Sequence, residues 1–241
     1  MSEEIHDADL QAADPLARLE FVDLTTAEHL AHLPPFEARI WGGGGDCVSV
    51  NMLVATVGEG GVAIGAFDGG EIVGAVYGFP TREPHVLHSH YMAVDPRWRR
   101  NRLGVALKQR QRLWCLERDI THMRWTYDPL QLGNAHLNLH VLGCRGVAYH
   151  VDYYGHLGGI NGSLPSDRVM VSWDLRDGAT KPDPELAVDV PTATPDDIAE
   201  SNEAALHARL TVRAELDERM RSGWQLVDVD RDGRRYLLAR G

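Results

Sequence analysis

The stretch Met92-Ala93-Val94-Asp95-Pro96-Arg97-Trp98-Arg99-Arg100-Asn101-Arg102-Leu103-Gly104-Val105-Ala106 decides the fold of this chain. It reads as the end of a strand, a proline stop and an arginine-rich turn that opens a helix. A helix start leaves backbone N–H groups without intrahelical partners and carries the positive end of the helix dipole. The small residues Gly104 and Ala106 let a phosphate approach that backbone. The stretch therefore predicts a site for a diphosphate-bearing ligand, with a solvated basic helix face as the alternative.

The net charge of the chain is strongly negative. Its 241 residues include 24 Lys and Arg against 35 Asp and Glu, a formal charge of −11 at pH 7. Most of such a surface would repel nucleic-acid phosphates and anionic membranes, so we expect neither as a partner. The four arginines within residues 97–102 are the local exception, and a phosphate ligand would explain why they gather there.

Cysteine use and the N-terminal sequence favour a cytoplasmic location. Cys47, Cys115 and Cys144 are widely spaced and form no Cys-x-x-Cys pair, which argues against a disulfide framework or a thiolate zinc site. Residues 1–20 lack the basic and apolar regions of a signal peptide, and no run reaches the ~20 apolar residues of a membrane span. We therefore expect structural cysteines, with Cys115 buried in a helix, and no metal.

Apolar runs and turn residues predict the remaining elements, and together they indicate a mixed α+β protein without a regular βαβ alternation. We expect strands at 21–24, 62–67, 72–79, 86–94, 122–127, 146–154, 168–175, near 188, 225–230 and 234–239, and helices at 27–41, 49–57, 98–118, 134–142 and 195–221. The helix at 98–118 reads as amphipathic, with residues 103, 106, 107, 110, 113, 114 and 117 along its apolar side.

The composition also suggests a division of the chain into parts. We expect a flexible acidic leader at 1–18, a main domain at 19–176, a linker at 177–184 and a small αβ subdomain at 185–241. The C-terminal hairpin of that subdomain offers a strand edge for pairing, so a homodimer is an open alternative to a monomer.

The opening stretch resembles the signature of the GNAT superfamily of acyl-CoA-dependent N-acetyltransferases. In that family a strand ends in Val-x-Pro, and Arg/Gln-x-x-Gly-x-Gly/Ala then opens a helix. Val94-Asp95-Pro96 and Asn101-Arg102-Leu103-Gly104-Val105-Ala106 match this signature in place and spacing. Asn101 departs from it, because Arg or Gln is usual there, but Arg100 and Arg102 lie beside it.

The resemblance extends over most of residues 20–241, to a group called predicted GNAT acetyltransferases. It is carried by Trp125–Leu130, Asn134–Gly143, Tyr153–Gly155, Leu164–Arg168 and Arg209–Arg213. It implies a mainly antiparallel twisted sheet with helices on both faces, acetyl-CoA or another acyl-CoA as co-substrate, and acetyl transfer to a primary amine of a small molecule. It implies that coenzyme A is bound by Met92, Ala93, Val94, Arg99, Arg100, Asn101, Arg102, Leu103, Gly104, Val105, Ala106, Asn134 and Asn138.

Two strand histidines are the candidates for the general base. His88 and His90 lie two apart on the predicted strand 86–94 and hence on one face, and histidine titrates near neutral pH. They could equally be hydrogen-bonded core residues, and a metal site there lacks a third ligand of obvious spacing. Asp128, at the end of the next strand, is either near the acyl group or a turn cap.

The acid that protonates the departing thiolate is harder to place. In many GNAT enzymes this acid is a tyrosine on the short helix before Leu-Gly. The corresponding residue here is Leu139. Asn138 could bond the sulfur or the pantetheine, and Tyr154, Tyr153 or a water would have to supply the proton. The absent tyrosine leaves a non-catalytic acyl-CoA-binding or regulatory module as the alternative function.

Overall fold

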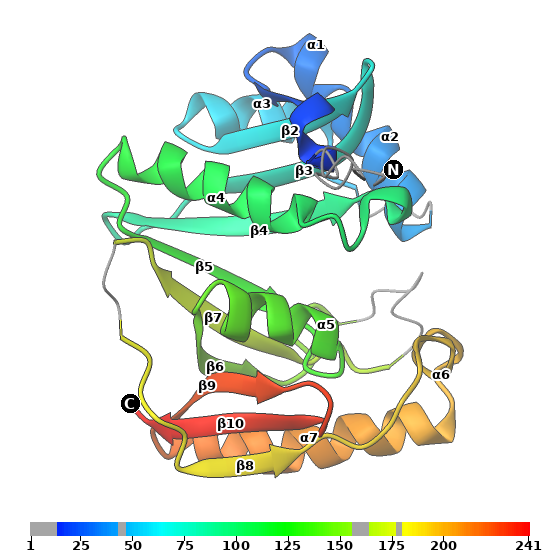
Figure 1. The fold of residues 1–241 in the computed structure, drawn as a ribbon, viewed down its shortest axis with the longest axis vertical. Coiled ribbons are helices and arrows are strands. Elements are labelled where there is room, and N and C mark those ends of the chain that lie inside the picture. The colour runs from blue at the N-terminus through cyan, green and yellow to red at the C-terminus, as the bar shows by residue number, and fades with distance from the viewer. Residues whose placement is uncertain (1–13, 43–46, 156–163, 177–179) are drawn as a thin grey trace, which may run out of the picture.

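A twisted sheet of ten strands runs through the computed structural model, which describes residues 14–42, 47–155, 164–176 and 180–241 (Figure 1). The strand order is β1-β2-β3-β4-β5-β7-β6-β9-β10-β8. The strands are β1 (Glu20–Asp23), β2 (Val62–Asp68), β3 (Glu71–Pro80), β4 (Val86–Val94), β5 (His122–Tyr127), β6 (Arg145–His150), β7 (Arg168–Asp174), β8 (Leu186–Asp189), β9 (Trp224–Asp230) and β10 (Arg235–Arg240). Among these pairings only β4 and β5 run parallel, so the predicted α+β class with a mainly antiparallel sheet is confirmed.

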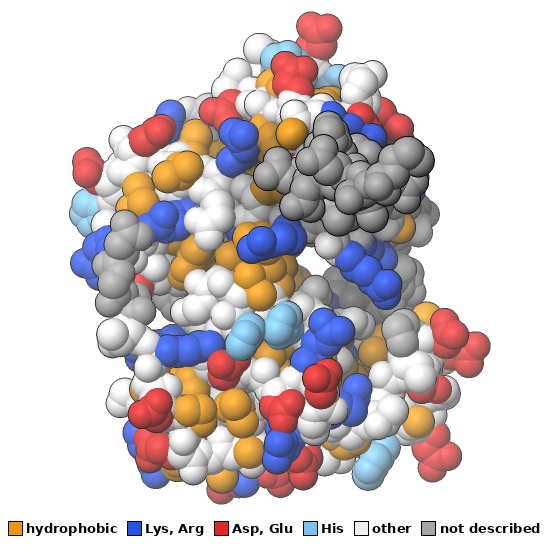
Figure 2. All heavy atoms as spheres, viewed as in Figure 1, with side chains coloured by type: hydrophobic (Ala, Val, Ile, Leu, Met, Phe, Trp, Pro, Cys, Tyr) orange, Lys and Arg blue, Asp and Glu red, His pale blue; other side chains and the backbone are white. Residues whose placement is uncertain are grey.

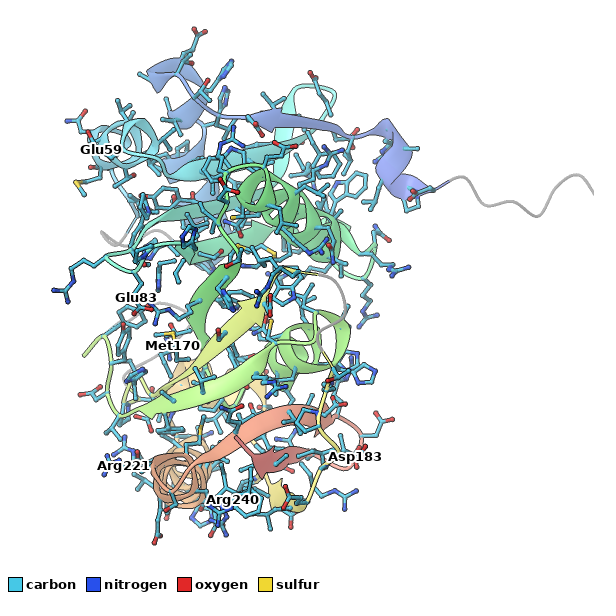
Figure 3. The ribbon with its side chains drawn as sticks, turned by 90° about the vertical axis from the view of Figure 1, so that its left-hand side faces the viewer. Glu59, Glu83, Met170, Asp183, Arg221 and Arg240 are labelled. Carbon is cyan, nitrogen blue, oxygen red and sulfur yellow. The ribbon has the colours of Figure 1, made fainter. Side chains whose placement is uncertain are left out.

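Helices cover both faces of the sheet (Figures 1 and 3). They are α1 (Ala27–Leu30), α2 (Leu33–Trp41), α3 (Val50–Gly58), α4 (Leu103–Leu116), α5 (Leu132–Ala135), α6 (Pro195–Glu200) and α7 (Glu203–Arg221), and α5 continues as a π-helix (His136–Val141). In the side view α4 and α5 lie on one face and α3 and α7 on the other. Glu59, which ends α3, lies toward one end of the molecule, and Arg221 and Arg240 lie at the opposite end.

Two of the predicted helices are each divided in two. The helix expected at 27–41 breaks between α1 and α2, because Pro34 and Pro35 have no N–H to continue the hydrogen bonds of α1, whereas proline is well tolerated in the first turn of α2. The helix expected at 195–221 breaks at Ser201, which has φ 53°, and Asn202 caps the new start by accepting a bond from the Ala205 N–H.

The long helix expected at 98–118 begins only at Leu103. Trp98 belongs to a 3₁₀ turn (Pro96–Trp98), and the chain then turns through left-handed conformations at Arg100 (φ 72°) and Arg102 (φ 59°). The prediction for the buried side of this helix was also wrong in part. The buried residues are Leu103, Leu107, Lys108, Gln111 and Cys115, whereas 110, 113 and 117 are exposed.

The C-terminal strands extend the same sheet. Strand β9 joins β6 at the pair Gly146 and Leu226, where a Cβ on residue 146 would lie only 2.8 Å from the Leu226 Cβ, so glycine permits this close approach. Of the expected leader 1–18, residues 1–13 lie outside the described part, and Pro15–Arg18 form a 3₁₀ turn. Of the expected linker 177–184, residues 177–179 also lie outside it. No helix in the described ranges is long and apolar enough to cross a membrane.

Candidate functional site

Strands β4 and β5 form a V. They pair only at Val86 with His122, Leu87 with Met123 and His88 with Arg124, and then they separate (Figure 1). Beyond His88, the edge of β4 that faces β5 therefore has no strand partner among the described residues. Its backbone donors and acceptors are available to a ligand, because such groups need partners when they are covered. The molecule is hollowed between the half that carries α4 and the half that carries α5 (Figure 2).

The turn between β4 and α4 lies at the open end of this V. Asp95 is buried, and its carboxylate accepts bonds from the Arg97 N–H at 2.9 Å and from Arg97 Nε at 3.0 Å. The pKa of Asp95 is lowered, chiefly by these bonds to Arg97. Arg97 therefore holds the turn in shape, whereas Arg99, Arg100 and Arg102 are exposed.

The start of α4 offers free backbone donors. Arg102 occupies the N-cap position and makes no side-chain capping bond, so the first N–H groups of the helix are not satisfied by a cap. The left-handed residues Arg100 and Arg102 reverse the chain immediately before the helix, a backbone shape typical of anion-binding turns. Together with the exposed arginines, these donors give the turn the chemistry that suits an anion such as a phosphate.

Gly104 lines the space between β4 and the π-helix. A Cβ at residue 104 would lie 3.1 Å from Met92 Cε and 3.9 Å from Leu137 Cδ2. Leu103 instead anchors the helix, because it is 1% exposed and packs against Gly74 of β3. Among the predicted coenzyme-binding residues, Gly104 thus borders the V, whereas Leu103 packs in the core that supports it.

The remaining predicted coenzyme-binding residues lie around the same turn. Ala93 is buried in the core on the face covered by α2 and α3, so only its backbone is available to the V. Val94 packs in the core on the side of α4. Val105 and Ala106 are half-buried in the first turn of α4, Asn101 is half-buried in the preceding turn, and Asn134 is exposed on α5.

His90 occupies a bulge in β4 at the point where the V begins. Ser89 pairs with Gly78 and Tyr91 with Tyr77, so His90 is the extra residue. Bulges of this kind redirect side chains and are common near active sites. Leu87 and Ser89 point toward α4, so His88 points to the opposite face.

The two candidate bases share an aromatic neighbour on that face. The Phe79 ring stacks on His88 at 4.9 Å between centroids and lies 5.6 Å from His90. Desolvation, followed by the neighbouring His90, Arg124 and Lys108, lowers the pKa of His88 to about 4. Desolvation also lowers the pKa of His90, whose surface is nevertheless exposed. The structure therefore brings both histidines together as neutral imidazoles at neutral pH.

Asn138 lies on the other face of the sheet, within the π-helix. It is 4% exposed, and its Oδ1 accepts a bond from Trp125 Nε1 of β5 at 3.3 Å. Leu139 beside it is completely buried and belongs to the core. The residue at the position of the missing tyrosine is thus an apolar core residue. Single-turn π-helices often mark functional sites.

Tyr154 is on the same face of the sheet as His88, not beside Asn138. Its hydroxyl lies 3.2 Å from Thr126 Oγ1, and Thr126 is the neighbour of Trp125 on β5. Successive strand residues face opposite sides of a sheet, so Tyr154 and Asn138 are separated by β5. The four predicted catalytic residues therefore divide between two faces.

Asp128 acts as a cap and an ion-pair partner. Its Oδ1 accepts the Leu130 N–H at 2.8 Å, and Arg209 of α7 donates to both carboxylate oxygens at 2.8 Å. Asp128 is 8% exposed and Arg209 is 2% exposed. With both oxygens engaged, the turn-cap interpretation of Asp128 is supported over a role as the base.

Two clusters of polar residues were missed by the sequence analysis. Glu37 of α2 is 2% exposed, accepts the Val48 N–H at 3.3 Å, and has its pKa raised by burial. Lys108 of α4 is 3% exposed and donates to Ser89 Oγ at 2.7 Å. Helical spacing from Gly104 would have placed Lys108 on the side of α4 that faces the V.

Metal chemistry has no obvious centre in the part of the chain that the structure describes. Across residues 14–42, 47–155, 164–176 and 180–241, no group of three or more His, Cys, Asp or Glu side chains could hold a metal ion. Cys115 and Cys144 are buried and unbonded to each other, as expected for structural thiols.

Comparison with known proteins identifies the fold and matches part of the chain to one family. Residues 40–140 match the model of the Acetyltransferase (GNAT) family. The chain is similar to the ribosomal-protein-S18-alanine N-acetyltransferase from Escherichia coli, with 16% identity and a TM-score of 0.55 over 67% of this chain and 96% of that one. It is similar to an acetyltransferase of the GNAT family from Streptococcus pneumoniae, with 15% identity and a TM-score of 0.53 over 64% of this chain and 98% of that one. It is also similar to the ribosomal-protein-alanine N-acetyltransferase from Brucella melitensis, with 14% identity and a TM-score of 0.53 over 64% of this chain and 99% of that one. No curated protein sequence matches. Residues 40–140 thus match the GNAT acetyltransferase family, and the chain has the fold of GNAT acetyltransferase structures.

Proposed function

We propose that this protein transfers the acetyl group of acetyl-CoA to a primary amine of a small molecule. The observation that carries the proposal is the phosphate-binding turn placed at the open end of the V between β4 and β5. Such a turn holds a diphosphate, and the unpaired edge of β4 then offers hydrogen bonds to the amide groups of a pantetheine arm.

The dimensions of the V suit this ligand. The limb of β4 from Ser89 to Val94 spans about 17 Å at the usual strand rise per residue. This length is comparable to that of an extended pantetheine arm, so a diphosphate at the turn places the thioester near the narrow end of the V. The bulge at His90 lies at that narrow end.

The histidines supply a base on the acceptor side. His88 has a pKa of about 4 and is neutral at pH 7, so its free nitrogen can accept a proton. The amine nitrogen attacks the carbonyl carbon of the thioester, His88 or His90 takes the amine proton, and the C–S bond breaks. An amide and the coenzyme A thiol are the products.

Two features favour a cationic acceptor. The chain has a formal charge of −11, which attracts cationic ligands over a distance. The acceptor face also carries the buried carboxyl group of Glu37, which lies beside the Tyr91 hydroxyl.

The experiment combines binding and turnover. Isothermal titration with acetyl-CoA measures the cofactor site, and thiol release with a panel of amines measures transfer. The panel includes small diamines and a peptide that begins with alanine, because two similar structures are those of ribosomal-protein-alanine acetyltransferases. Turnover of small amines supports the proposal, turnover of the peptide alone moves the acceptor class to proteins, and binding without turnover indicates a non-catalytic module. Failure to bind acetyl-CoA refutes the proposal.

A further inference from the structure

Lys108 lies at the apex of the V. Its Nζ donates to Ser89 Oγ at 2.7 Å and lies 3.7 Å from the centroid of the Trp125 ring. Ser89 follows the last residue of β4 that pairs with β5, and Trp125 follows the last residue of β5 that pairs with β4. On the α4 side of the sheet, the ammonium group therefore contacts a side chain from each strand at the first position where the two strands have separated.

This ammonium group has no counter-charge among the described residues. Its other polar contact is Gln111 Oε1 at 3.5 Å, and the side chain is only 3% exposed. The nearby thiols of Cys115 and Cys144 stay neutral, because burial raises the pKa of Cys115 to about 12 and raises that of Cys144 further. A buried cation without an anion is destabilising, so its presence calls for a compensating role.

The environment of Lys108 also connects to Asn138. The Trp125 ring that covers the ammonium donates from Nε1 to Asn138 Oδ1, so α4, β4, β5 and the π-helix all contribute to one buried polar cluster. Gln111 Nε2 within this cluster has no hydrogen-bond partner in the described part of the chain. The cluster thus combines several donors at the place where the thioester would lie.

We propose that Lys108 is the catalytic acid of the acetyl transfer, supplying its proton to the coenzyme A thiolate at the apex of the V. The inference rests on the proposed function and fills the role left open by Leu139. When the C–S bond breaks, its electron pair goes to sulfur. A proton then passes from Lys108 Nζ to that sulfur, which leaves the thiol and a neutral amine, and solvent returns the proton to Lys108.

The acid–base properties of the site agree with this role. Desolvation lowers the pKa of Lys108 to about 7, so the group can both give and regain a proton near neutral pH. The titratable groups around it are Cys115 on its own helix, Cys144 after the π-helix and His88 on β4. The two thiols are protonated and His88 is neutral at this pH, so Lys108 is the group that titrates.

The test measures the thiol contact apart from turnover. Coenzyme A and desulfo-coenzyme A, which lacks the thiol, are titrated into the wild type, Lys108→Met and Lys108→Arg between pH 6 and 9. The wild type should bind coenzyme A about tenfold more tightly than desulfo-coenzyme A at pH 8. Lys108→Met should lose that preference, with kcat reduced at least a hundredfold and the KM for acetyl-CoA changed less than threefold. Lys108→Arg should keep the binding preference, because the guanidinium also donates hydrogen bonds.

Lys181→Met is the matched control, because Lys181 pairs with Asp228 at 2.9 Å away from α4. It should behave as the wild type. An unchanged ratio of the two affinities in Lys108→Met overturns the inference while the proposed function stands. If the wild type binds neither ligand, the proposed function fails and the inference fails with it. Ser89→Ala, which keeps the ammonium, provides the second variant if Lys108→Met does not fold, and it should shift the pH profile of kcat without abolishing the preference for the thiol.

Discussion

Replacing Arg209 by methionine should destabilise the protein strongly, because it leaves a buried carboxylate without its cation. The guanidinium of Arg209 donates two bonds of 2.8 Å to Asp128, and the exposed fractions of the two side chains are 2% and 10%. Breaking a buried ion pair from one side costs roughly 3–5 kcal/mol. A domain of ordinary stability unfolds with only about 5–15 kcal/mol, so the loss should be large and visible.

Urea denaturation followed by circular dichroism measures this loss. The double variant Arg209→Met with Asp128→Asn should recover most of it, because a neutral amide needs no counter-charge and can still accept the Leu130 N–H bond. The matched control is Arg221→Met on the same helix. Arg221 is 75% exposed, so its pair with the half-buried Asp217 should contribute less than about 1 kcal/mol. A loss below about 1 kcal/mol for Arg209→Met, or losses that simply add in the double variant, would refute the reasoning.

Three further predictions concern the site. Gly104→Val should weaken acetyl-CoA binding at least tenfold, as measured by isothermal titration, because the added carbons meet Met92. The control Gly133→Ala should leave the affinity unchanged, because no atom lies within 4 Å of the added Cβ. If the base is His88 or His90, replacing that histidine by glutamine should lower kcat by a factor of about 10²–10⁴. Because the pKa of His88 is about 4, the base-dependent limb of the kcat/KM profile should lie below pH 6 if His88 is the base. Wild-type activity in both variants contradicts the assignment. The pKa of Lys108 falls from 10.5 to about 7 on folding. The free energy of unfolding should therefore increase by up to roughly 5 kcal/mol as the pH rises from about 7 to 10.5, because the unfolded state binds the proton more tightly. Denaturation curves of Lys108→Met should lack that increase.

The local chemistry of the sequence was enough to predict the turn between β4 and α4. Proline at 96 ends a strand in almost any context, and the small residues at 104 and 106 follow at helical spacing after the arginines. These are short-range properties, so the turn and the start of α4 could be anticipated to within a few residues. The hairpin of β2 and β3 was predictable for the same reason, because Gly69 and Gly70 form its turn with φ values of 57° and 87°.

The arrangement of the side chains in the site could not be derived in this way. Whether Lys108 or Leu113 faces the core depends on where α4 begins, and the left-handed residues before Leu103 shift that start by five residues from Trp98. The bulge at His90 depends on its register with β3, a strand ten or more residues away. Such features result from long-range packing, which outweighs local preference.

The sheet itself separates the two proton transfers that the proposed reaction needs. His88 and Ser89 are adjacent on β4, yet His88 faces Phe79 on the acceptor side while Ser89 contacts Lys108 on the side of α4. A base and an acid on the same face would exchange protons directly, but here the backbone of β4 lies between them. An amine that approaches from the side of His88 and a sulfur that departs toward Lys108 would lie on opposite sides of the carbonyl carbon. The V between β4 and β5 is where the two sides meet, so the strand separation at Ser89 and Trp125 determines where transfer can occur.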